Sequence, residues 1–524
     1  MRSNKIKLFF MFNKRNIYIV LVAVILLGAF LRFYKLGNNS FVADEFLDIN
    51  STYAYFKTGI WQNWDFNFGE VNAENVFEAR DERAWIYKWQ VAELFKFFPP
   101  TEAVARTVSA LWGVLSIFLI YLAGNYFSKK RTIGILSAFL FAISIGGIEF
   151  DRRFRMYAMF LPVYLVFSWL LFQFLEGKYR GKISLLKRFS DKWSINPLYV
   201  FPALLAGILS LMTHQLTANI VFVLGFYLVF WAFFAWKRNK SYFNKYSLIL
   251  EMGILGFVLI YILIPKEFKS FSAGLKFFDN HWGYLGIAFS DYISGILAAI
   301  FLVLGIYFIA KKQNLSKESA WLAMSFLVPL FSAIFLWSRN VGGQYIFFIK
   351  PFGTILIASG IYFLAKFFQD NLRDYGKKAY LATIILALLI LPNYAYFFQS
   401  DNAYNQTSSS SNPNYRKIFT YFKKYKKDGD VLITRNFRNY YWSGSKIKVF
   451  DFGGELSKEK LSLEDIKKIT AENPSGWFIV SGNDESYISN DAIEYVVRNL
   501  EKISNPQVRG DVIVYRWGNL GISE

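Results

Sequence analysis

Residues 17–33 read IYIVLVAVILLGAFLRF, an almost unbroken apolar run that follows the basic segment 1–16. A helix needs about 20 mostly apolar residues to cross the hydrocarbon core of a bilayer. The run also has the appearance of a secretory signal peptide, but no small-residue cleavage site follows it. We therefore predict that it is retained as a first membrane span.

The composition of the whole chain agrees with this prediction. Of the 524 residues, 54% are apolar and 20% are aromatic, and the mean hydropathy is +0.26. These values disfavour a soluble enzyme of this size. The chain has no cysteine, which excludes disulfides and thiolate chemistry and leaves carboxylates, histidine or water to hold any metal.

Apolar runs of similar length recur over residues 1–400, separated by short basic loops. The sequence predicts an α-helical polytopic membrane protein with about 11 transmembrane helices. They cover residues 17–34, 103–124, 132–148, 156–175, 198–212, 216–236, 247–264, 291–310, 320–337, 344–365 and 379–398.

The least certain boundary lies in the apolar stretch 198–236, where Thr213, His214 and Gln215 interrupt the run. With a turn there, the loops on the side of the N-terminus carry 25 Lys or Arg against five Asp or Glu, whereas the short loops on the other side carry seven Lys or Arg. The positive-inside rule then places the N-terminus in the cytoplasm. Because the basic residues of the +21 net charge lie between spans, they do not indicate nucleic-acid binding.

Two large segments are predicted to lie outside the cytoplasm. The first is the loop 35–102. The second follows a serine-rich linker over 401–412 and forms a small α/β domain over 413–524, in which short β-rich runs (431–434, 447–452, 477–480 and 512–517) alternate with helical segments near 457–471 and 490–500.

Asp44 and Glu45 follow the first span closely, within the sequence FVADEF of residues 41–46. A carboxylate held in a partly dry cleft at the outer membrane face can act as a general base toward a hydroxyl group. A solvated loop acid is the alternative. Asp48 shares a helical face with Asp44. The simpler interpretation of Asp48 is an acid near a helix N-terminus, where the helix dipole favours its negative charge.

Further along the same loop, residues 79–89 read ARDERAWIYKW. Acids there could hold a divalent cation while Arg83 or Lys88 binds a phosphate. The simpler alternative is an amphipathic interfacial helix whose charges pair with one another.

Charged residues also stand in the later external loops. Arg152, Arg153 and Arg155 violate the positive-inside bias, and they would bind a phosphate-bearing ligand at the outer leaflet, a lipid headgroup, or the nearby Glu149 and Asp151. Arg339 and Lys350 would add positive charge around a phosphate or extend to the interface. Of the two histidines, His281, next to an acid in an external loop, is a better metal candidate than His214 in the proposed turn.

Together these features resemble the GT-C glycosyltransferases, in particular the protein O-mannosyltransferase and aminoarabinose transferase group. The resemblance rests on the Asp44-Glu45 pair after the first span, the segment 79–89, the sequence TEAVARTVSA at 101–110, and RMYA at 155–158. It is strongest over residues 17–175.

The resemblance implies an integral membrane enzyme that moves a sugar from a polyprenyl-phosphate donor to an extracytoplasmic protein, lipid or glycan. Asp44 would be the catalytic base and Glu45 its supporting neighbour. Laying the EKPPLxY stretch of the aminoarabinose transferases on residues 82–87 makes Glu82 a metal ligand and Arg83 a donor-phosphate ligand. His281 would complete the site of a divalent metal whose identity is unknown. Here Ala84-Trp85 replaces the Pro-Pro, and Arg153 replaces the acid that many relatives carry before span four.

A single carboxylate acting through an acceptor hydroxyl predicts one displacement with inversion. Lys88, Arg152, Arg155 and Arg339 are further donor-phosphate candidates. Two alternatives from other classes are a transporter of lipid-linked saccharide or polysaccharide, which should carry ionisable residues near mid-membrane, and a non-catalytic surface receptor.

Overall fold

The computed structural model describes residues 14–42, 44–72, 82–263, 280–338, 341–372, 375–406, 413–452, 460–503 and 512–518. The chain forms two compact units. We call the first the helical unit (Met1–Arg32, Ala110–Asp151 and Tyr157–Tyr394) and the second the mixed unit (Phe33–Ser109, Arg152–Met156 and Ala395–Glu524).

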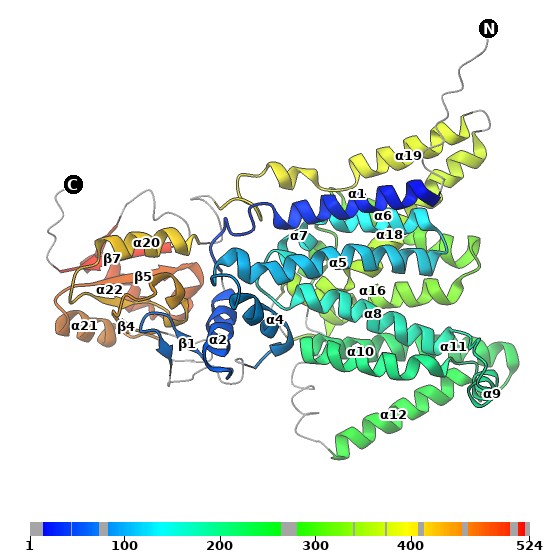
Figure 1. Ribbon diagram of the computed structural model, residues 1–524, viewed down its shortest axis with the longest axis horizontal. Helices are drawn as coiled ribbons and strands as arrows, with labels where there is room; N and C mark the ends of the chain where they lie inside the picture. The colour runs from blue at the N-terminus through cyan, green and yellow to red at the C-terminus, as the bar shows by residue number, and fades with distance from the viewer. Residues whose placement is uncertain are drawn as a thin grey trace, which may run out of the picture. The chain divides into compact units, whose positions relative to one another are not determined.

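The chain is an α-helical, multi-pass membrane protein. Among the described residues, eight helices are long and apolar enough to cross a membrane, or up to ten spans if each of two bent helix pairs counts as one. In Figure 1 most of the long helices lie roughly along one axis, whereas α12 is inclined to them. The eight are α1 (Lys14–Phe33), α5 (Glu102–Ser128), α8 (Tyr157–Glu176), α11 (Asn219–Asn239) with η2 (Gln215–Ala218), α12 (Lys245–Leu263), α15 (Gly295–Tyr307) with η3 (Phe308–Lys312), α16 (Ser316–Phe335), and α17 (Gly343–Ile346) with η4 (Phe347–Ile349) and α18 (Lys350–Asn371).

The two bent pairs and one shorter helix complete the order predicted from hydropathy. The bent pairs are α6 (Arg131–Ala142) with α7 (Ile145–Asp151), at 61°, and α9 (Ser184–Trp193) with η1 (Pro197–Tyr199) and α10 (Val200–Thr213), at 102°. The eleventh predicted stretch holds α19 (Gly376–Ile390), which has 15 residues and is therefore shorter than a typical span. A short helix, α14 (Gly283–Ala288), precedes α15.

The structure confirms the predicted turn in the stretch 198–236. His214 has an extended backbone (φ −158°, ψ 138°) and ends α10. Its imidazole Nδ1 accepts a hydrogen bond from the backbone N–H of Leu216 at 3.0 Å. His214 thus caps the turn, which explains why a polar residue interrupts this apolar run.

Small residues allow two helices of the helical unit to approach closely. A Cβ atom added at Gly305 in α15 would lie 1.9 Å from the carbonyl oxygen of Leu356 in α18, and one added at Gly360 in α18 would lie 1.9 Å from that of Phe301 in α15. Both glycines are therefore required for this contact, as expected where membrane helices pack through their backbones.

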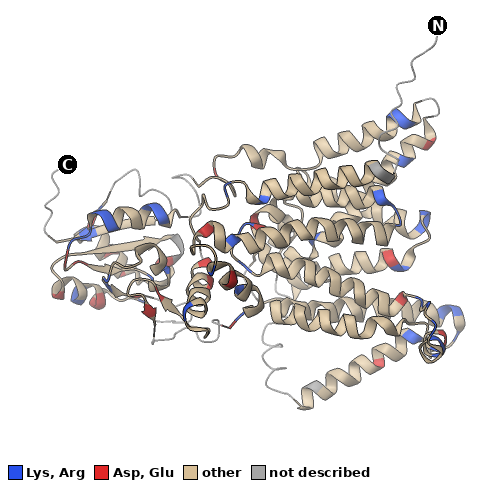
Figure 2. Ribbon diagram, viewed as in Figure 1, with Lys and Arg blue, Asp and Glu red and all other residues tan. Residues whose placement is uncertain are grey.

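The charged residues of the helical unit gather at the helix ends, as Figure 2 shows. At one end, the buried carboxylate of Glu176 in α8 accepts hydrogen bonds from the hydroxyls of Tyr227 (3.1 Å) and Tyr246 (2.9 Å). It also pairs with the ammonium groups of Lys245 (3.0 Å) and Lys317. One acid thereby connects α8, α11, α12 and α16.

The mixed unit contains the first loop. Its described elements are α2 (Glu45–Thr58), the two-stranded antiparallel pair β1 (Trp64–Asp65) and β2 (Glu70–Val71), and α4 (Trp85–Phe95). Aromatic side chains fill its interior: the ring of Tyr53 lies 4.7 Å from that of Phe66, and the ring of Phe46 lies 5.2 Å from that of Tyr415. The first loop therefore packs with the C-terminal part of the chain rather than standing alone.

The described part of the C-terminal segment forms a five-stranded sheet in the order β4-β3-β5-β7-β6. β3 (Val431–Ile433) is parallel to β4 (Lys448–Phe450) and to β5 (Gly476–Ser481), while β7 (Val512–Trp517) is antiparallel to β5 and to β6 (Glu501–Lys502). Around it lie α20 (Tyr415–Tyr425), α21 (Leu463–Glu472), α22 (Asn490–Asn499), and the short helices η6 (Asn436–Trp442) and η7 (Gly482–Tyr487). The short helix η5 (Tyr394–Phe398) precedes this segment in the chain.

The predicted α/β character of this segment is confirmed, strand by strand, for β3, β4, β5 and β7. The two-residue strand β6 and the helix α20 were not predicted from the sequence. The helix expected from residue 457 begins at Leu463 in the described residues, after the cap of Ser462 and Asp465. The predicted division into 1–400, a linker over 401–412 and a domain over 413–524 stays a prediction, and residues 407–412 lie outside the described residues.

We predict that Glu176→Ala lowers the free energy of unfolding by about 3 kcal/mol, because it leaves buried hydroxyl and ammonium groups without their shared acceptor. Thermal denaturation of the detergent-solubilised protein measures this loss. Asp191→Ala removes an exposed acid of α9 and serves as the control. Equal stability of the two variants would contradict the role assigned to Glu176.

Candidate active site

The candidate site of the first loop is built around a buried ion pair in the mixed unit. The carboxylate of Glu45 accepts hydrogen bonds from Arg106 in α5, with Oε1 2.9 Å from Nε and Oε2 2.7 Å from Nη2. Both residues are buried, with 1% and 4% of their surfaces exposed. A bidentate guanidinium–carboxylate pair of this kind fixes the orientation of both groups.

Further hydrogen bonds complete the surroundings of this pair. Glu45 accepts from the backbone N–H groups of Val42 (3.1 Å) and Phe154 (2.7 Å). Burial alone would raise the pKa of Glu45, but the charge of Arg106 and these hydrogen bonds lower it below its ordinary value. Arg106 in turn donates to the carbonyl oxygens of Leu36, Asn39 and Ser40. The pair thus joins three segments of the chain.

Asp44 and Asp48 lie next to this pair and face one guanidinium group. Asp44 precedes α2, and its side chain is 47% exposed. Its Oδ2 lies 2.9 Å from Nη2 of Arg155, and Oδ2 of Asp48 lies 2.8 Å from Nη1 of the same arginine. Burial raises the pKa of Asp48, although the charges of Arg155 and Lys88 oppose that rise. The structure therefore brings Asp44, Glu45, Asp48 and Arg155 together.

The helix α4 contributes a buried lysine near these acids. Lys88 is 1% exposed, and its Nζ donates to the hydroxyl of Ser51 at 3.0 Å and lies 5.0 Å from the ring centre of Trp61. Its positive charge, like that of the partly exposed Arg83, acts on Asp48. The preceding residue, Tyr87, is also buried and shares a hydrogen bond of 2.5 Å with Ser109 of α5. The described part of this segment, residues 82–89, is therefore not only an interfacial helix, because Tyr87 and Lys88 lie in the interior.

Arg152 holds backbone segments in place. Its guanidinium donates to the carbonyl oxygens of Tyr34 (2.7 Å), Lys35 (3.1 Å) and Ala403 (3.0 Å) and lies 4.5 Å from the ring centre of Tyr404. This arrangement connects the end of the first span with the segment before α20. The predicted role of Arg152 in phosphate binding stays a prediction.

Sequence reasoning did not find the partners that hold the site, namely Arg106, Glu102 and Arg416. Arg416 of α20 donates to Glu102 at the start of α5 (2.6 Å) and to the carbonyl oxygen of Gly37 (2.8 Å). The hydroxyl of Tyr441 also donates to Glu102, at 2.6 Å. Arg106 and Glu102 stand in the stretch 101–110 that carries the family resemblance, and that stretch was the available signal.

Lys350 has a partner within the helical unit. Its Nζ lies 2.7 Å from Oδ2 of Asp291, which also accepts from the hydroxyl of Ser144 (2.7 Å) and the backbone N–H of Gly146 (3.0 Å). Lys350 is 6% exposed. The sequence offered two interpretations of Lys350: its side chain extends to the membrane interface, or it binds a phosphate. Neither fits an ammonium group that is buried and paired with Asp291.

The predicted metal ligands are described separately, because Glu82 belongs to the mixed unit and His281 to the helical unit. Glu82 is exposed. The backbone N–H of His281 donates to the carbonyl oxygen of Ile334 at 2.9 Å. Across the described ranges, no group of three or more His, Asp or Glu side chains could hold a metal ion. The metal therefore stays a prediction, and no step is derived through it. Arg339 lies outside the described residues.

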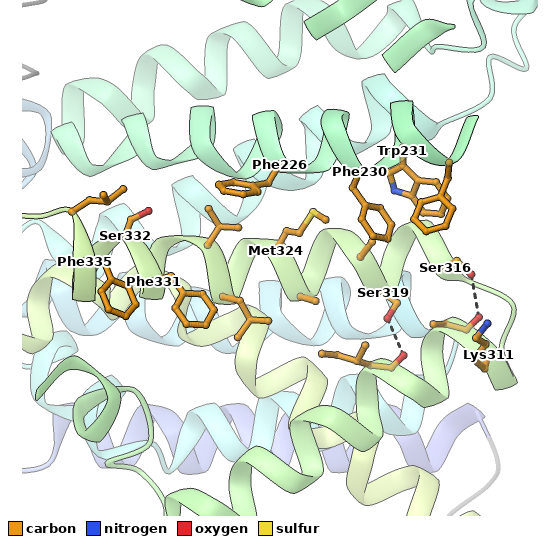
Figure 3. Close-up of a pocket in the computed structure, with 18 residues that line it drawn as sticks. Phe226, Phe230, Trp231, Lys311, Ser316, Ser319, Met324, Phe331, Ser332 and Phe335 are labelled. Atoms are coloured by element: carbon orange, nitrogen blue, oxygen red, sulfur yellow. Dashed lines mark hydrogen bonds between the residues drawn. The ribbon is translucent and has the colours of Figure 1, made fainter. Parts of the chain in front are cut away.

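The helical unit also contains an apolar groove of about 820 Å³. It is lined by residues of α11, α15, η3 and α16, and Figure 3 shows aromatic rings along it, with Lys311 at one end and Phe335 at the other. Phe226, Phe230, Trp231 and Phe331 supply further rings. A surface of this composition suits a hydrocarbon chain.

Comparison with solved structures identifies the fold. The Archaeoglobus fulgidus oligosaccharyltransferase in its apo form is 11% identical, with a TM-score of 0.59 over 91% of this chain and 70% of that one. ArnT from Cupriavidus metallidurans in the apo state is 13% identical, with a TM-score of 0.53 over 95% of this chain and 97% of that one. The fold is that of the GT-C glycosyltransferases.

The GT-C fold is recognised through structure and not through sequence similarity. No protein-family model matches the chain, and no curated protein matches its sequence. One further similar structure is the A. fulgidus enzyme AglB in complex with an inhibitory peptide and a dolichol-phosphate (9% identity, TM-score 0.60, 97% of this chain and 75% of that one). The predicted GT-C resemblance is confirmed at the level of the fold.

We predict that Glu45 makes the stability of the mixed unit sensitive to acid. Because its pKa is lowered in the folded state, the stabilisation is present above the ordinary pKa of 4.5 and is lost as the pH falls through the lowered value. As the pH is lowered from about 6 to about 3, the melting temperature should therefore decrease less for Glu45→Gln than for the wild type.

At neutral pH, Glu45→Gln should be less stable than the wild type, because Arg106 keeps its buried charge without a carboxylate partner. Glu70→Gln changes an exposed acid of the same loop and should melt like the wild type at every pH. An acid dependence of Glu45→Gln as steep as that of the wild type would argue against the ion pair.

Proposed function

We propose that this chain is a membrane glycosyltransferase that moves a sugar from a polyprenyl-phosphate donor to an extracytoplasmic acceptor. The observation that carries the proposal is the half-exposed carboxylate of Asp44, which lies 2.9 Å from the guanidinium of Arg155 and directly before the buried residue Glu45. The GT-C fold supports it. Among the similar structures, ArnT was determined bound to undecaprenyl phosphate, and AglB in complex with a dolichol-phosphate.

In the proposed reaction, Asp44 accepts the proton of the acceptor hydroxyl while the hydroxyl oxygen forms a bond to the anomeric carbon. The bond from that carbon to the phosphate oxygen breaks, and polyprenyl phosphate leaves with the electron pair. A single displacement inverts the anomeric carbon. Glu45 acts as a positioning residue, because its carboxylate is already saturated by Arg106 and two backbone N–H groups.

The leaving phosphate requires positive charge near Asp44. Arg155 is in contact with Asp44, and the charges of Arg83 and Lys88 act on the neighbouring Asp48. Guanidinium groups stabilise a phosphate through charge-assisted hydrogen bonds. We assign donor-phosphate binding to Arg155, Arg83 and Lys88.

The proposal includes an orientation in the cell membrane. The N-terminus lies in the cytoplasm, because the loops on its side carry the large excess of Lys and Arg. The first loop and the C-terminal α/β domain then lie on the outer face. A donor carried by a lipid suits that side, because the reaction then requires no soluble nucleotide sugar.

We expect Asp44→Asn to lower the rate of sugar transfer by about 100- to 10,000-fold, which is the usual contribution of a general base. Transfer from purified polyprenyl-phosphate sugar by the protein in detergent measures it. Glu70→Gln, which removes an exposed acid of the same loop, should keep the wild-type rate. A folded Asp44→Asn variant with wild-type transfer would exclude Asp44 as the base.

We expect Arg83→Ala to weaken donor binding by roughly 2–5 kcal/mol if the phosphate is dry and has no other partner. Isothermal titration with the polyprenyl-phosphate sugar measures the affinity. Lys57→Ala, at an exposed position of α2, removes a similar charge and should bind like the wild type. An unchanged affinity of Arg83→Ala would remove Arg83 from the donor site.

A further inference from the structure

The C-terminal α/β domain carries a cluster of charged residues at one edge of its sheet. β3, β4 and β5 are parallel, so their carboxyl ends meet at the same edge. Arg435 and Asn436 follow β3, Asp451 follows β4, and Asp484 follows β5. The chain passes from β3 to β4 on one side and then to β5 on the other side of β3. In open α/β sheets, ligands bind outside the carboxyl ends of the strands at such a reversal of strand order.

Helices cover opposite faces of the sheet beside this reversal. On one face, the ring of Phe422 in α20 lies 5.6 Å from that of Trp477 in β5. On the other, α21 and α22 contribute Ile466 and Val496 to the core cluster that contains Phe478 of β5. A crevice between helices on opposite faces is the usual result of this topology.

One arginine of the cluster is fully paired. Nη1 and Nη2 of Arg438 lie 2.6 Å and 2.7 Å from the two carboxylate oxygens of Asp484. Asp484 also accepts from the backbone N–H (3.0 Å) and the hydroxyl (2.9 Å) of Ser481. Arg438 and Asp484 therefore form a closed structural pair, and Asp484 has little capacity left for a second arginine.

The other arginine is buried without such a partner. Arg435 is 6% exposed and lies between two rings, 4.4 Å from the centre of Tyr487 and 4.8 Å from that of Phe437. Its nearest approach to Asp484 is 3.7 Å, which is longer than a hydrogen bond. Within the described ranges, its Nε and Nη2 have no hydrogen-bond acceptor.

These two atoms form one edge of the guanidinium group. Parallel N–H groups on that edge bind both oxygens of a carboxylate or phosphate in the bidentate geometry that arginine favours. A buried charged donor without an acceptor is unfavourable, so an oxyanion would gain the full strength of the interaction. The charge of Asp451 acts on Arg435, but neither Asp451 nor any other described residue accepts a hydrogen bond from Nε or Nη2 of Arg435.

We propose that Arg435 is the centre of an oxyanion-binding site of the α/β domain, which receives a carboxylate or phosphate group of the acceptor molecule. The loop that carries Arg435 continues into η6, and Asn50 of α2 donates to the carbonyl oxygen of Phe437 in η6 at 3.0 Å. Since α2 begins directly after Asp44, the site and the proposed base share one packed segment of the mixed unit. The assignment to the acceptor rests on the proposed function, whereas anion binding by itself does not.

The test is anion-dependent stabilisation of the full-length protein in detergent, without donor. The melting temperature is measured against increasing inorganic phosphate or acetate, at constant ionic strength set with chloride. We expect at least one of the two anions to stabilise the wild type in a saturable manner, and Arg435→Gln to raise the half-saturating concentration at least about tenfold. The responding anion identifies phosphate or carboxylate as the preferred group.

Arg498→Gln removes a surface guanidinium of α22 and should respond like the wild type. Should Arg435→Gln fail to fold, Arg435→Lys keeps the charge, loses the two-donor edge and should still weaken binding several-fold. Absence of saturable stabilisation in the wild type, or an equal response of the Arg435 variants, would overturn the site. Absence of sugar transfer from polyprenyl-phosphate donors by the wild-type protein would overturn the transferase proposal and leave anion binding standing.

Discussion

The buried ion pair between Glu45 and Arg106 is the constraint on which the candidate site depends. Both charges are removed from water, so each requires the other and the backbone groups around it. Arg106 donates to the carbonyls of Leu36, Asn39 and Ser40, and Glu45 accepts from the backbone of Val42 and Phe154. The segment that follows the first span, the start of α5 and the segment before α8 are thereby held in one arrangement. The same arrangement fixes the position of Asp44, because Asp44 directly precedes Glu45.

The buried and site-forming charged groups described above fall into two classes. In the first class, each charge is paired with an opposite charge. The examples are Lys350 with Asp291, Arg438 with Asp484, and the cluster around Glu176. These pairs stabilise the structure. In the second, a charge remains accessible or has a free donor edge, as in Asp44 with its half-exposed carboxylate and Arg435 with its unsatisfied edge. The second class is where a reaction or a ligand is expected, because binding there satisfies a group that the protein leaves open.

The C-terminal segment contributes to the candidate site as well as forming its own domain. Arg416 and Tyr441 converge on Glu102 at the start of α5. The C-terminal rings of Tyr415 and Tyr440 pack against Phe46 and Phe41 of the first loop. The tail therefore supports the loop that carries Asp44. This relation gives a physical reason for a sheet domain in a chain that is otherwise mostly helical.

The sequence by itself predicted the order of the apolar helices and four of the strands of the α/β domain, and the structure confirms both. The membrane orientation and the role of Asp44 as the base stay predictions. These properties depend on local patterns: the length of an apolar run, the period of a strand, or the position of an acid after a span. Only the tertiary structure decided which charges meet. Glu45 and Arg106 are 61 residues apart, and Arg155 reaches Asp48 over 107 residues. No local period encodes such a pairing, because it arises when separate helices pack and remove both groups from water.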